Sequence, residues 1–309
     1  MGIAREILLR ASRSAWLADQ MTRRGFARRA VRRFMPGEDV GSALDASESL
    51  RRHDLTTILT LLGENVASAT EVDAVTEHYL EVLDRVVERR LDTDVSVKPT
   101  QFGIDLGFDL AREGIERVAR RASEGSRMLA IDMESSAYTD RTLELYRQLR
   151  ADHQNVTLCL QAYLRRTATD LETLLPAGPH IRLVKGAYKE PANLAIRSKR
   201  EVDENYLRLA EILLDSARAG NGRVYFGTHD TGLIDQICRR AEISGVSRDR
   251  FEFQMLYGIQ RQAQLDLAKR GFHTRVLISY GESWFPWFMR RLAERPANLL
   301  FLLRNLVAR

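Results

Sequence analysis

The sequence predicts an α/β protein whose main part is a (β/α)8 barrel. Short apolar segments rich in β-branched residues alternate with longer charged segments of helical periodicity. This alternation occurs eight times over roughly 250 residues, the usual length of such a barrel. A doubly wound open sheet would alternate in the same way, but no G-x-G-x-x-G follows the first strand segment and no P-loop occurs. We therefore prefer the barrel.

The chain begins with a basic segment of helical character. Residues 1–34 contain nine arginines against Glu6 and Asp19, and the turn-rich stretch 36–39 follows them. We expect an N-terminal helical arm at residues 1–50 and a barrel catalytic domain at residues 51–309. A basic amphipathic arm suits contact with an anionic membrane surface, although two ordinary helices with basic outer faces also fit. Binding to nucleic acid is not expected, because aromatic and basic residues are not interleaved.

Eight segments are the expected strands. Most are apolar runs bounded by Gly, Pro, Asp or Asn. In chain order they are residues 55–62, 93–99, 128–133, 156–161, 180–185, 223–227, 251–255 and 275–279. Between them, segments such as 143–150, 198–219 and 260–269 place charged residues at helical spacing, so we expect helices there.

The cellular location is expected to be cytoplasmic. No run of 18 or more apolar residues occurs, so no membrane-spanning helix is predicted. The N-terminus lacks the continuous apolar stretch of a secretory signal. Cys159 and Cys238 have neither metal-ligand nor disulfide-framework spacing, which indicates buried thiols in a reducing compartment. Peripheral contact at the inner membrane surface, through the basic arm, is a further expectation.

Polar stretches stand at the carboxyl ends of the second to the seventh expected strands. They are residues 97–101, 131–134, 160–163, 182–188, 227–230 and 253–258. Each stretch by itself is more often structural, because polar residues commonly end strands. In a barrel, however, all of these ends lie on one face and form the active site. Their coincidence therefore predicts a functional site at that face.

The residue types at these ends favour chemistry performed by a bound cofactor. Neither a cluster of metal ligands nor a G-x-S-x-G nucleophile elbow occurs, so we expect no metal and no serine nucleophile. Lys98 and Lys185 could form a Schiff base, but Lys185 follows Arg182 by three residues. Such a cationic neighbourhood favours anion or cofactor binding over a neutral, nucleophilic lysine. Fixed cations with few nucleophiles suit a redox cofactor.

Adjacent arginines stand in the last helix-like segment. Arg290 and Arg291 directly follow the aromatic run 284–288. A guanidinium fork matches a carboxylate bidentately, and Glu294 is spaced at i+4 and i+3 from the two arginines, so it can hold them. A solvated basic helix face is the ordinary explanation for such a pair. The aromatic run favours a walled site for a carboxylate.

Together these motifs resemble the proline dehydrogenase family. The similarity runs in order over roughly residues 55–305, and its most specific parts are the stretch 182–188 and the Arg290-Arg291-x-x-Glu294 segment. The polar stretches 97–101, 131–134, 161–163, 228–229 and 253–258 support it. The likeness is to the short, monofunctional form, in which no aldehyde dehydrogenase domain follows. It implies a distorted (β/α)8 TIM-like barrel whose last helix packs over the carboxyl ends of the strands.

The resemblance also implies bound FAD and a set of site residues. The implied cofactor-binding residues are Met133, Gln161, Arg182, Val184, Lys185, Gly186, Ala187, Thr228 and His229. The implied substrate-binding residues are Lys98, Tyr188, Leu256, Leu277, Trp287, Arg290, Arg291, Glu294 and Glu64. Asp132 and Arg182 are the implied catalytic residues. In this arrangement the two arginines clamp the substrate carboxylate, and Glu64 pairs with the first of them when the site closes.

The implied reaction is the first step of proline catabolism. L-proline is oxidised to 1-pyrroline-5-carboxylate by hydride transfer to flavin N5, and the electrons pass to a quinone. A two-arginine clamp on a small ring could hold the reacting carbon within about 3–3.5 Å of its acceptor. A cation near the flavin N1–C2=O edge would stabilise the reduced anion, and Arg182 is the candidate.

Two positions depart from the family pattern. Trp287 stands where the family has a tyrosine three residues before the arginine pair, and Leu277 stands where it has a tyrosine on the last strand. Tolerated variation within proline dehydrogenases is one explanation. The other is a changed substrate, such as a modified proline or another secondary-amine or N-substituted amino acid. The retained arginine pair predicts a carboxylate in either case.

Overall fold

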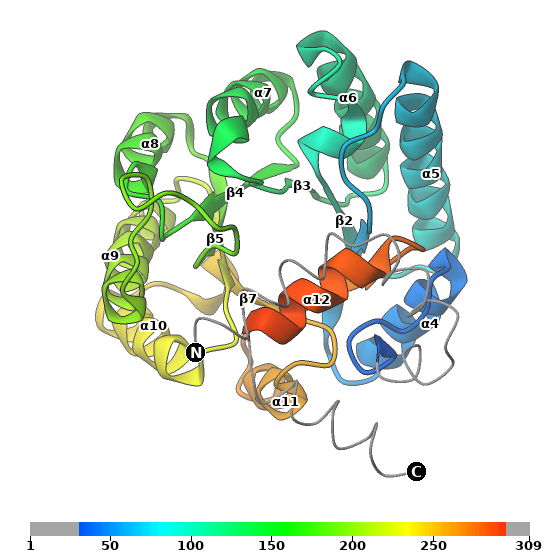
Figure 1. Ribbon diagram of the computed structural model, residues 1–309. Helices are drawn as coiled ribbons and strands as arrows, with labels where there is room; N and C mark the ends of the chain where they lie inside the picture. Colours follow the sequence, from blue (N-terminus) through cyan, green and yellow to red (C-terminus); the bar gives the residue numbers. More distant parts are fainter. Residues whose placement is uncertain (1–30, 295–309) are drawn as a thin grey trace, which may run out of the picture.

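Eight parallel strands close into one barrel in the computed structural model, which describes the backbone of residues 31–294 and the side chains of residues 31–289 (Figure 1). Each strand pairs with its neighbours in the chain, and β1 also pairs with β8, which closes the barrel. The strands are β1 (Thr56–Leu61), β2 (Thr93–Val97), β3 (Leu129–Ile131), β4 (Val156–Gln161), β5 (His180–Val184), β6 (Arg223–Gly227), β7 (Phe251–Leu256) and β8 (Thr274–Tyr280). The predicted barrel and each of its predicted strands are confirmed.

Helices alternate with the strands, and all of the described helices except α12 lie around the barrel wall (Figure 1). They are α4 (Val40–Arg51), α5 (Ala69–Glu88), α6 (Phe108–Glu124), α7 (Thr139–Asp152), α8 (Thr167–Leu174), α9 (Lys199–Arg218), α10 (Thr231–Ile243), α11 (Arg261–Lys269) and α12 (Trp284–Glu294). Side-chain caps fix several starting points. Ser68, Ser198 and Asp230 accept hydrogen bonds from backbone N–H groups in the first turns of α5, α9 and α10. These caps also fix where each loop at the active-site end must stop.

Helix α12 differs from the others because it lies across the end of the barrel instead of along its wall (Figure 1). Its apolar side packs in a separate group, here called the α12 cluster. The buried members are Val31, Phe34, Met35, Leu62, Trp284, Phe285, Trp287, Phe288 and Met289. Trp284 also donates its indole N–H to Glu38 at 3.1 Å. The resemblance implied a last helix over the strand ends, and residues just before α4 help to hold α12 there.

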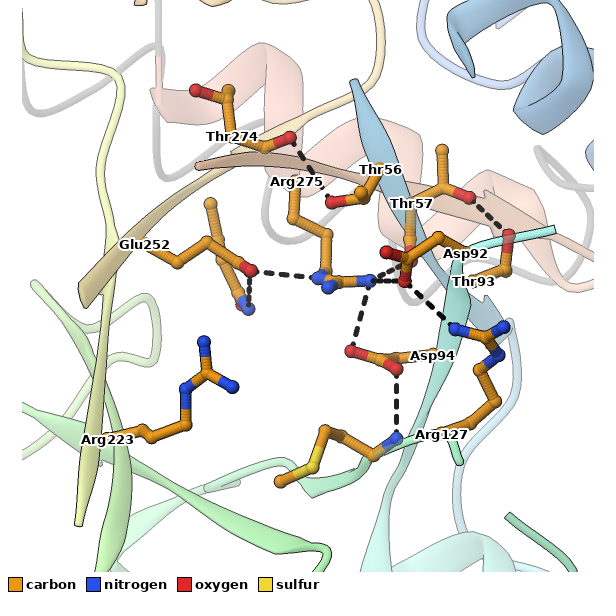
Figure 2. Close-up of polar contacts among 12 residues, drawn as sticks. Thr56, Thr57, Asp92, Thr93, Asp94, Arg127, Arg223, Glu252, Thr274 and Arg275 are labelled. Atoms are coloured by element: carbon orange, nitrogen blue, oxygen red, sulfur yellow. Dashed lines mark hydrogen bonds and ion pairs between the residues drawn. The ribbon is translucent and has the colours of Figure 1, made fainter. Parts of the chain in front are cut away.

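Charged residues fill the opposite, amino-terminal end of the barrel interior, here called the floor cluster (Figure 2). Arg275 pairs with Glu252 at 2.9 Å, with Asp94 at 3.1 Å and with Asp92 at 3.3 Å. Burial raises the pKa of Asp94 to about 6, although the neighbouring Arg275 opposes this shift. In barrels of this kind that end serves stability, whereas the other end serves function.

The basic arm predicted from the sequence falls mostly outside the described residues, so its boundary at residue 50 stays a prediction. Among the residues that the structure does describe, no helix combines the length and the apolar character needed to span a bilayer.

Candidate active site

A cavity of about 660 Å³ lies at the carboxyl ends of strands β3 to β8. It is where the polar stretches were predicted to converge, because parallel strands in a barrel bring those ends together. The predicted site residues that line it are Asp132, Met133, Gln161, Arg182, Val184, Lys185, Gly186, Ala187, Tyr188, Thr228, His229, Leu256 and Leu277. The structure thus gathers most of the predicted residues, while their individual roles stay predictions.

One carboxylate organises the cations on the β2–β3–β5 side of the cavity. Asp132 accepts hydrogen bonds from Arg182 and, at 2.8 Å, from the Ser96 hydroxyl. Arg182 is 3% exposed and also donates to Ser96 at 3.1 Å. The Lys98 ammonium lies 3.7 Å from the other Asp132 oxygen. Lys98, which is not among the cavity-lining residues, is therefore linked to the site through Asp132.

A second ion-pair group lies on the β5–β6 side. The Lys185 ammonium is 2.5 Å from Asp203 on α9 and 2.9 Å from Asp230, the N-cap of α10. Although burial opposes its charged form, the hydrogen bond from Lys185 leaves the pKa of Asp230 below its ordinary value. Lys199 lines the cavity and lies 3.3 Å from Asp203.

The sequence placed Asp230 in the polar stretch 227–230 but gave it no role, and it did not assign Asp203 or Lys199 to the site. A capping role for Asp230 could have been predicted, because Asp230 stands directly before a helical pattern. Asp203 and Lys199 gave no such signal. They reach the site from the first turns of a helix, so only the packing of α9 beside β5 brings them there.

The loop after β5 is held in a defined conformation. Gly186 has φ 112°, and a Cβ added there would lie 2.1 Å from the Tyr163 ring, so glycine is required. Farther along, the Glu190 carboxylate accepts from the Ser136 backbone N–H at 2.7 Å and from the Ser136 hydroxyl. These contacts fix both ends of the stretch that presents Ala187 and Tyr188 to the cavity.

The side chain of His229 is fixed by strand β7. Its Nε2 atom accepts a hydrogen bond of 2.8 Å from the backbone N–H of Leu256. A nitrogen that accepts carries no proton, which assigns the ring proton to Nδ1. This hydrogen bond thereby connects two predicted site residues, His229 and Leu256.

A buried acid joins the turns that follow β2 and β3. Glu134 is 3% exposed and accepts from the Thr100 backbone N–H at 3.0 Å and from the Thr100 hydroxyl at 2.7 Å. Burial raises its pKa to about 7, Lys98 lowers it, and Glu64 raises it further. The predicted substrate residue Glu64 is not among the cavity-lining residues, but its charge acts on this acid.

The predicted carboxylate clamp can be placed only at the level of the backbone. Arg290, Arg291 and Glu294 lie in the last part of α12, and their side chains are outside the described part of the chain. Trp287 is 8% exposed and packs in the α12 cluster, and it is not among the cavity-lining residues. Leu277, the other departure from the family pattern, does line the cavity.

The chemistry of the cavity wall fits a flavin. Gln161 Oε1, Arg182 Nη1 and Gln254 Oε1 are buried atoms that have no hydrogen-bond partner among the described residues. Their side chains all line the cavity. Buried polar atoms are nearly always paired, so two acceptors and one donor here suit a ligand that offers both kinds of group. A flavin does so, because its ring carries carbonyl oxygens and an N–H and its chain carries hydroxyls.

Comparison with known proteins gives a consistent family. Residues 43–304 match the family model described as Proline dehydrogenase. The chain is 36% identical to Proline dehydrogenase 2 of Bacillus subtilis (strain 168) over 304 residues, which cover 98% of this chain and 99% of that protein. It is 35% identical to a Proline dehydrogenase of Deinococcus radiodurans over 280 residues, 89% of each chain.

Solved structures share the fold. Proline utilization A from Bdellovibrio bacteriovorus matches with a TM-score of 0.80 and 23% identity, covering 87% of this chain. A mutant of proline utilization A from Bradyrhizobium japonicum matches with a TM-score of 0.74 and 20% identity over 88% of this chain. This chain spans about a third of the length of those proteins, 33% and 31% respectively.

Proposed function

This chain belongs to the proline dehydrogenase family, and we propose that it is an FAD-dependent enzyme that oxidises L-proline to 1-pyrroline-5-carboxylate. The observation that carries the proposal is the cavity at the carboxyl ends of the strands. Its wall combines fixed cations with buried polar atoms that have no partner among the described residues. Among the described residues no serine lines this cavity, and its two lysines, Lys185 and Lys199, are held in ion pairs with carboxylates.

The residues proposed to hold FAD lie on β3 to β6 and in the loops that follow them. The side-chain contacts are assigned to Gln161, Arg182, Lys185, Thr228 and His229. The remaining contacts are assigned to Met133, Val184, Gly186 and Ala187, which line the same wall. FAD, when bound, supplies the acceptor for the hydride that leaves C5 of proline. Arg182, already buried and charged, contributes positive charge beside the ring without reorganising during the reaction.

The substrate is proposed to bind between this wall and α12. Arg290 and Arg291 bind the carboxylate, while Lys98, Tyr188 and Leu256 shape the pocket and Glu64 and Glu294 orient the arginines. Loss of hydride from C5 requires the lone pair of the ring nitrogen, so the ammonium must give up a proton. We assign the Asp132 carboxylate to accept that proton and pass it to solvent, because Asp132 lines the cavity and its position is fixed by Arg182 and Ser96.

The proposed electron acceptor is a quinone, reached at the inner surface of the cytoplasmic membrane. Arg32 and Arg33, at the described end of the basic arm, are exposed and line a cavity of about 500 Å³ together with Arg261. Their charge favours an anionic lipid surface. Replacing the seven arginines of residues 1–30 with glutamine should weaken binding to anionic vesicles in a sedimentation assay. Unchanged binding would remove the basic arm from the proposal.

The experiment that tests the function uses the flavin as its own indicator. The purified chain should take up FAD and become yellow, and anaerobic L-proline should bleach the absorbance of the bound flavin. A colourless protein that does not take up FAD would refute the proposed function. A flavin that is bound but not bleached by proline would leave the cofactor assignment standing and refute the substrate.

The second candidate substrate is a proline modified on its ring. The observation that favours it is Leu277, which lines the cavity at a position where the family pattern has a tyrosine. An apolar side chain in place of a hydroxyl changes both the space and the hydrogen bonding there. Bleaching rates with L-proline and with 4-hydroxy-L-proline should be compared for the wild type and for Leu277→Tyr. A preference for the analogue that reverses in the variant would support this candidate.

A further inference from the structure

The wall of the cavity contains an acceptor to which the sequence assigned no role, the amide oxygen of Gln254, although Gln254 lies in the polar stretch 253–258. Gln254 lies on β7, is 6% exposed and lines the cavity. Its Oε1 atom is buried and has no hydrogen-bond partner among the described residues. An acceptor left unpaired in a low-dielectric wall costs free energy unless a ligand supplies a donor.

The orientation of this amide is set by a neighbour one layer deeper in the barrel. Gln254 Nε2 donates to Glu252 Oε1 at 2.9 Å. A carboxylate only accepts hydrogen bonds, so the NH2 group of Gln254 must face Glu252 and the oxygen must face away from it. Because the Gln254 side chain lines the cavity, we infer that its unpaired oxygen lies on that side. The amide therefore cannot present its NH2 to the cavity without breaking this bond.

The floor cluster in turn holds Glu252 in place. Arg275 Nε donates to the same Glu252 oxygen at 2.9 Å, and Arg275 is anchored by Asp94 at 3.1 Å (Figure 2). Arg275 and Glu252 are 8% and 4% exposed, so solvent does not compete for these contacts. A continuous chain of hydrogen bonds thus runs from the floor cluster to an acceptor in the cavity wall.

We propose that Gln254 is a cofactor-binding residue whose amide oxygen accepts a hydrogen bond from a proton donor of the bound flavin. This inference rests on the proposed function. Glu252 and Arg275 are then positioning residues, because they act on the cofactor only through the orientation of that amide. The ring N3–H and the ribityl hydroxyls are the flavin groups that can donate.

The flavin is a better occupant than the substrate for two reasons. First, Gln254 shares a property with Gln161 and Arg182: each has a buried polar atom without a hydrogen-bond partner among the described residues. Gln161 and Arg182 line the wall assigned to FAD. Second, the substrate carboxylate is assigned to α12, which crosses the outer end of the barrel (Figure 1). Gln254 lies deeper, at the level where β7 pairs with Gly227 of β6 and Arg275 of β8.

The test measures FAD affinity by dilution of the full-length holoenzyme, together with the absorbance spectrum of the bound flavin. Gln254→Met keeps the length of the side chain and removes the acceptor, and it should weaken FAD binding about tenfold and alter the spectrum. Glu252→Gln replaces a carboxylate, which can only accept, by an amide that can also donate, so the Gln254 amide is free to turn. This variant should also weaken FAD binding, by about threefold. The double variant should match Gln254→Met, because Glu252 acts through Gln254.

A matched control comes from a second buried glutamine. Gln101 is 2% exposed, its amide oxygen also has no partner among the described residues, and its Nε2 atom donates to the Leu61 carbonyl at 3.0 Å. It is not among the cavity-lining residues. Gln101→Met should therefore leave FAD affinity and the flavin spectrum unchanged, even where it lowers thermal stability.

Each result has a distinct meaning. Wild-type FAD affinity in Gln254→Met, with bleaching by proline intact, would overturn this inference and leave the proposed function standing. A raised KM for proline with unchanged FAD affinity would assign the acceptor to the substrate and overturn the cofactor assignment. Additive losses in the double variant would overturn the positioning role of Glu252.

Gln254→Met could fail to fold. In that case, wild-type FAD affinity and spectrum in Glu252→Gln would overturn the proposal that Glu252 orients the Gln254 amide toward the flavin. A wild type that binds no FAD would refute the proposed function itself, and this inference with it.

Discussion

At the scale of single residues, the site is organised by charges that fix one another before any ligand arrives. Asp132 holds Arg182 and Lys98, while Lys185 is held by Asp203 and Asp230. Such preorganised charges cost little reorganisation during a reaction. Removing one partner of a buried ion pair leaves the other charge uncompensated. Single substitutions here should therefore have measurable effects on both stability and activity.

Glu134 should make stability depend on pH. Because its folded-state pKa is raised to about 7, its contribution is fully present below its ordinary value of 4.5 and is lost as pH rises through 7. Glu134→Gln stays neutral throughout. The free energy of unfolding of the wild type should therefore fall between pH 5 and pH 8 by on the order of 2 kcal/mol more than that of the variant.

Urea unfolding at the two pH values measures this difference. The exposed Glu144→Gln serves as the control and should keep the pH dependence of the wild type. An equal fall in wild type and Glu134→Gln would show that Glu134 is not the titrating group.

The arginine pair gives the second prediction at this scale. Arg290→Lys and Arg291→Lys each replace a bidentate fork by a point charge, and each should raise the KM for proline by roughly 10- to 100-fold, as for a lost charged hydrogen bond of about 1.5–3 kcal/mol. FAD affinity should be unchanged, because α12 is not assigned to the cofactor. Steady-state kinetics with equal flavin occupancy measure this. Unchanged Michaelis constants in both variants would refute the clamp.

At the scale of elements, α12 links a small apolar cluster to the proposed substrate clamp. Phe288 is fully buried, and its ring centroid lies 6.1 Å from that of Phe34 and 6.2 Å from that of Trp284. This cluster is separate from the main core around the barrel. We therefore expect that weakening this cluster displaces α12 before the barrel unfolds.

Phe288→Ala should loosen α12 selectively. Removing a buried phenylalanine costs about 3–5 kcal/mol of packing free energy. Here that loss should weaken the packing of α12 against the rest of the protein. We expect at least a tenfold rise in the KM for proline with nearly unchanged FAD affinity, and faster proteolytic cleavage near α12. The control is Ile243→Ala, at a residue that is 87% exposed on α10. Equal losses of FAD and substrate binding in Phe288→Ala would indicate general unfolding instead.

Element by element, the strands were the predictable part of this fold. Each is a short apolar run ended by a turn residue or a polar stretch, and each predicted strand overlaps an observed one. Several boundaries differ by one or two residues. For example, β2 ends at Val97, because Pro99, which cannot donate a backbone hydrogen bond, begins a 3-10 turn. The crossing of α12 was implied by the resemblance and not by periodicity.

At the scale of the whole molecule, the barrel interior is polar along much of its length. The floor cluster fills the amino-terminal end, and the Asp132–Arg182 pair and Gln254 lie nearer the cavity. A buried ion pair is weak evidence for stability, but removing one partner leaves a charge uncompensated. Arg275 is the residue on which the floor carboxylates depend.

Arg275→Met should destabilise the whole barrel. It leaves Asp94 and Glu252 buried without their cation, at a cost of about 3–5 kcal/mol near pH 8. The loss should be smaller at pH 5, because burial has already raised the pKa of Asp94 to about 6 and removing Arg275 raises it further, so that Asp94 becomes neutral. Urea unfolding at both pH values measures this, with the exposed Arg218→Met as control. An equal loss at the two pH values would contradict the account.

By itself the sequence determined the barrel, the order of its strands and the face on which the candidate site lies. Local periodicity and turn residues encode strands, and parallel closure then brings every polar strand end to one place. Only the tertiary structure decided which side chains complete that site. Asp203 reaches Lys185 from a helix, and Gln254 is oriented through Glu252 and Arg275. Contacts between residues far apart in the chain leave no local pattern, because they depend on how elements pack and not on the spacing within one element.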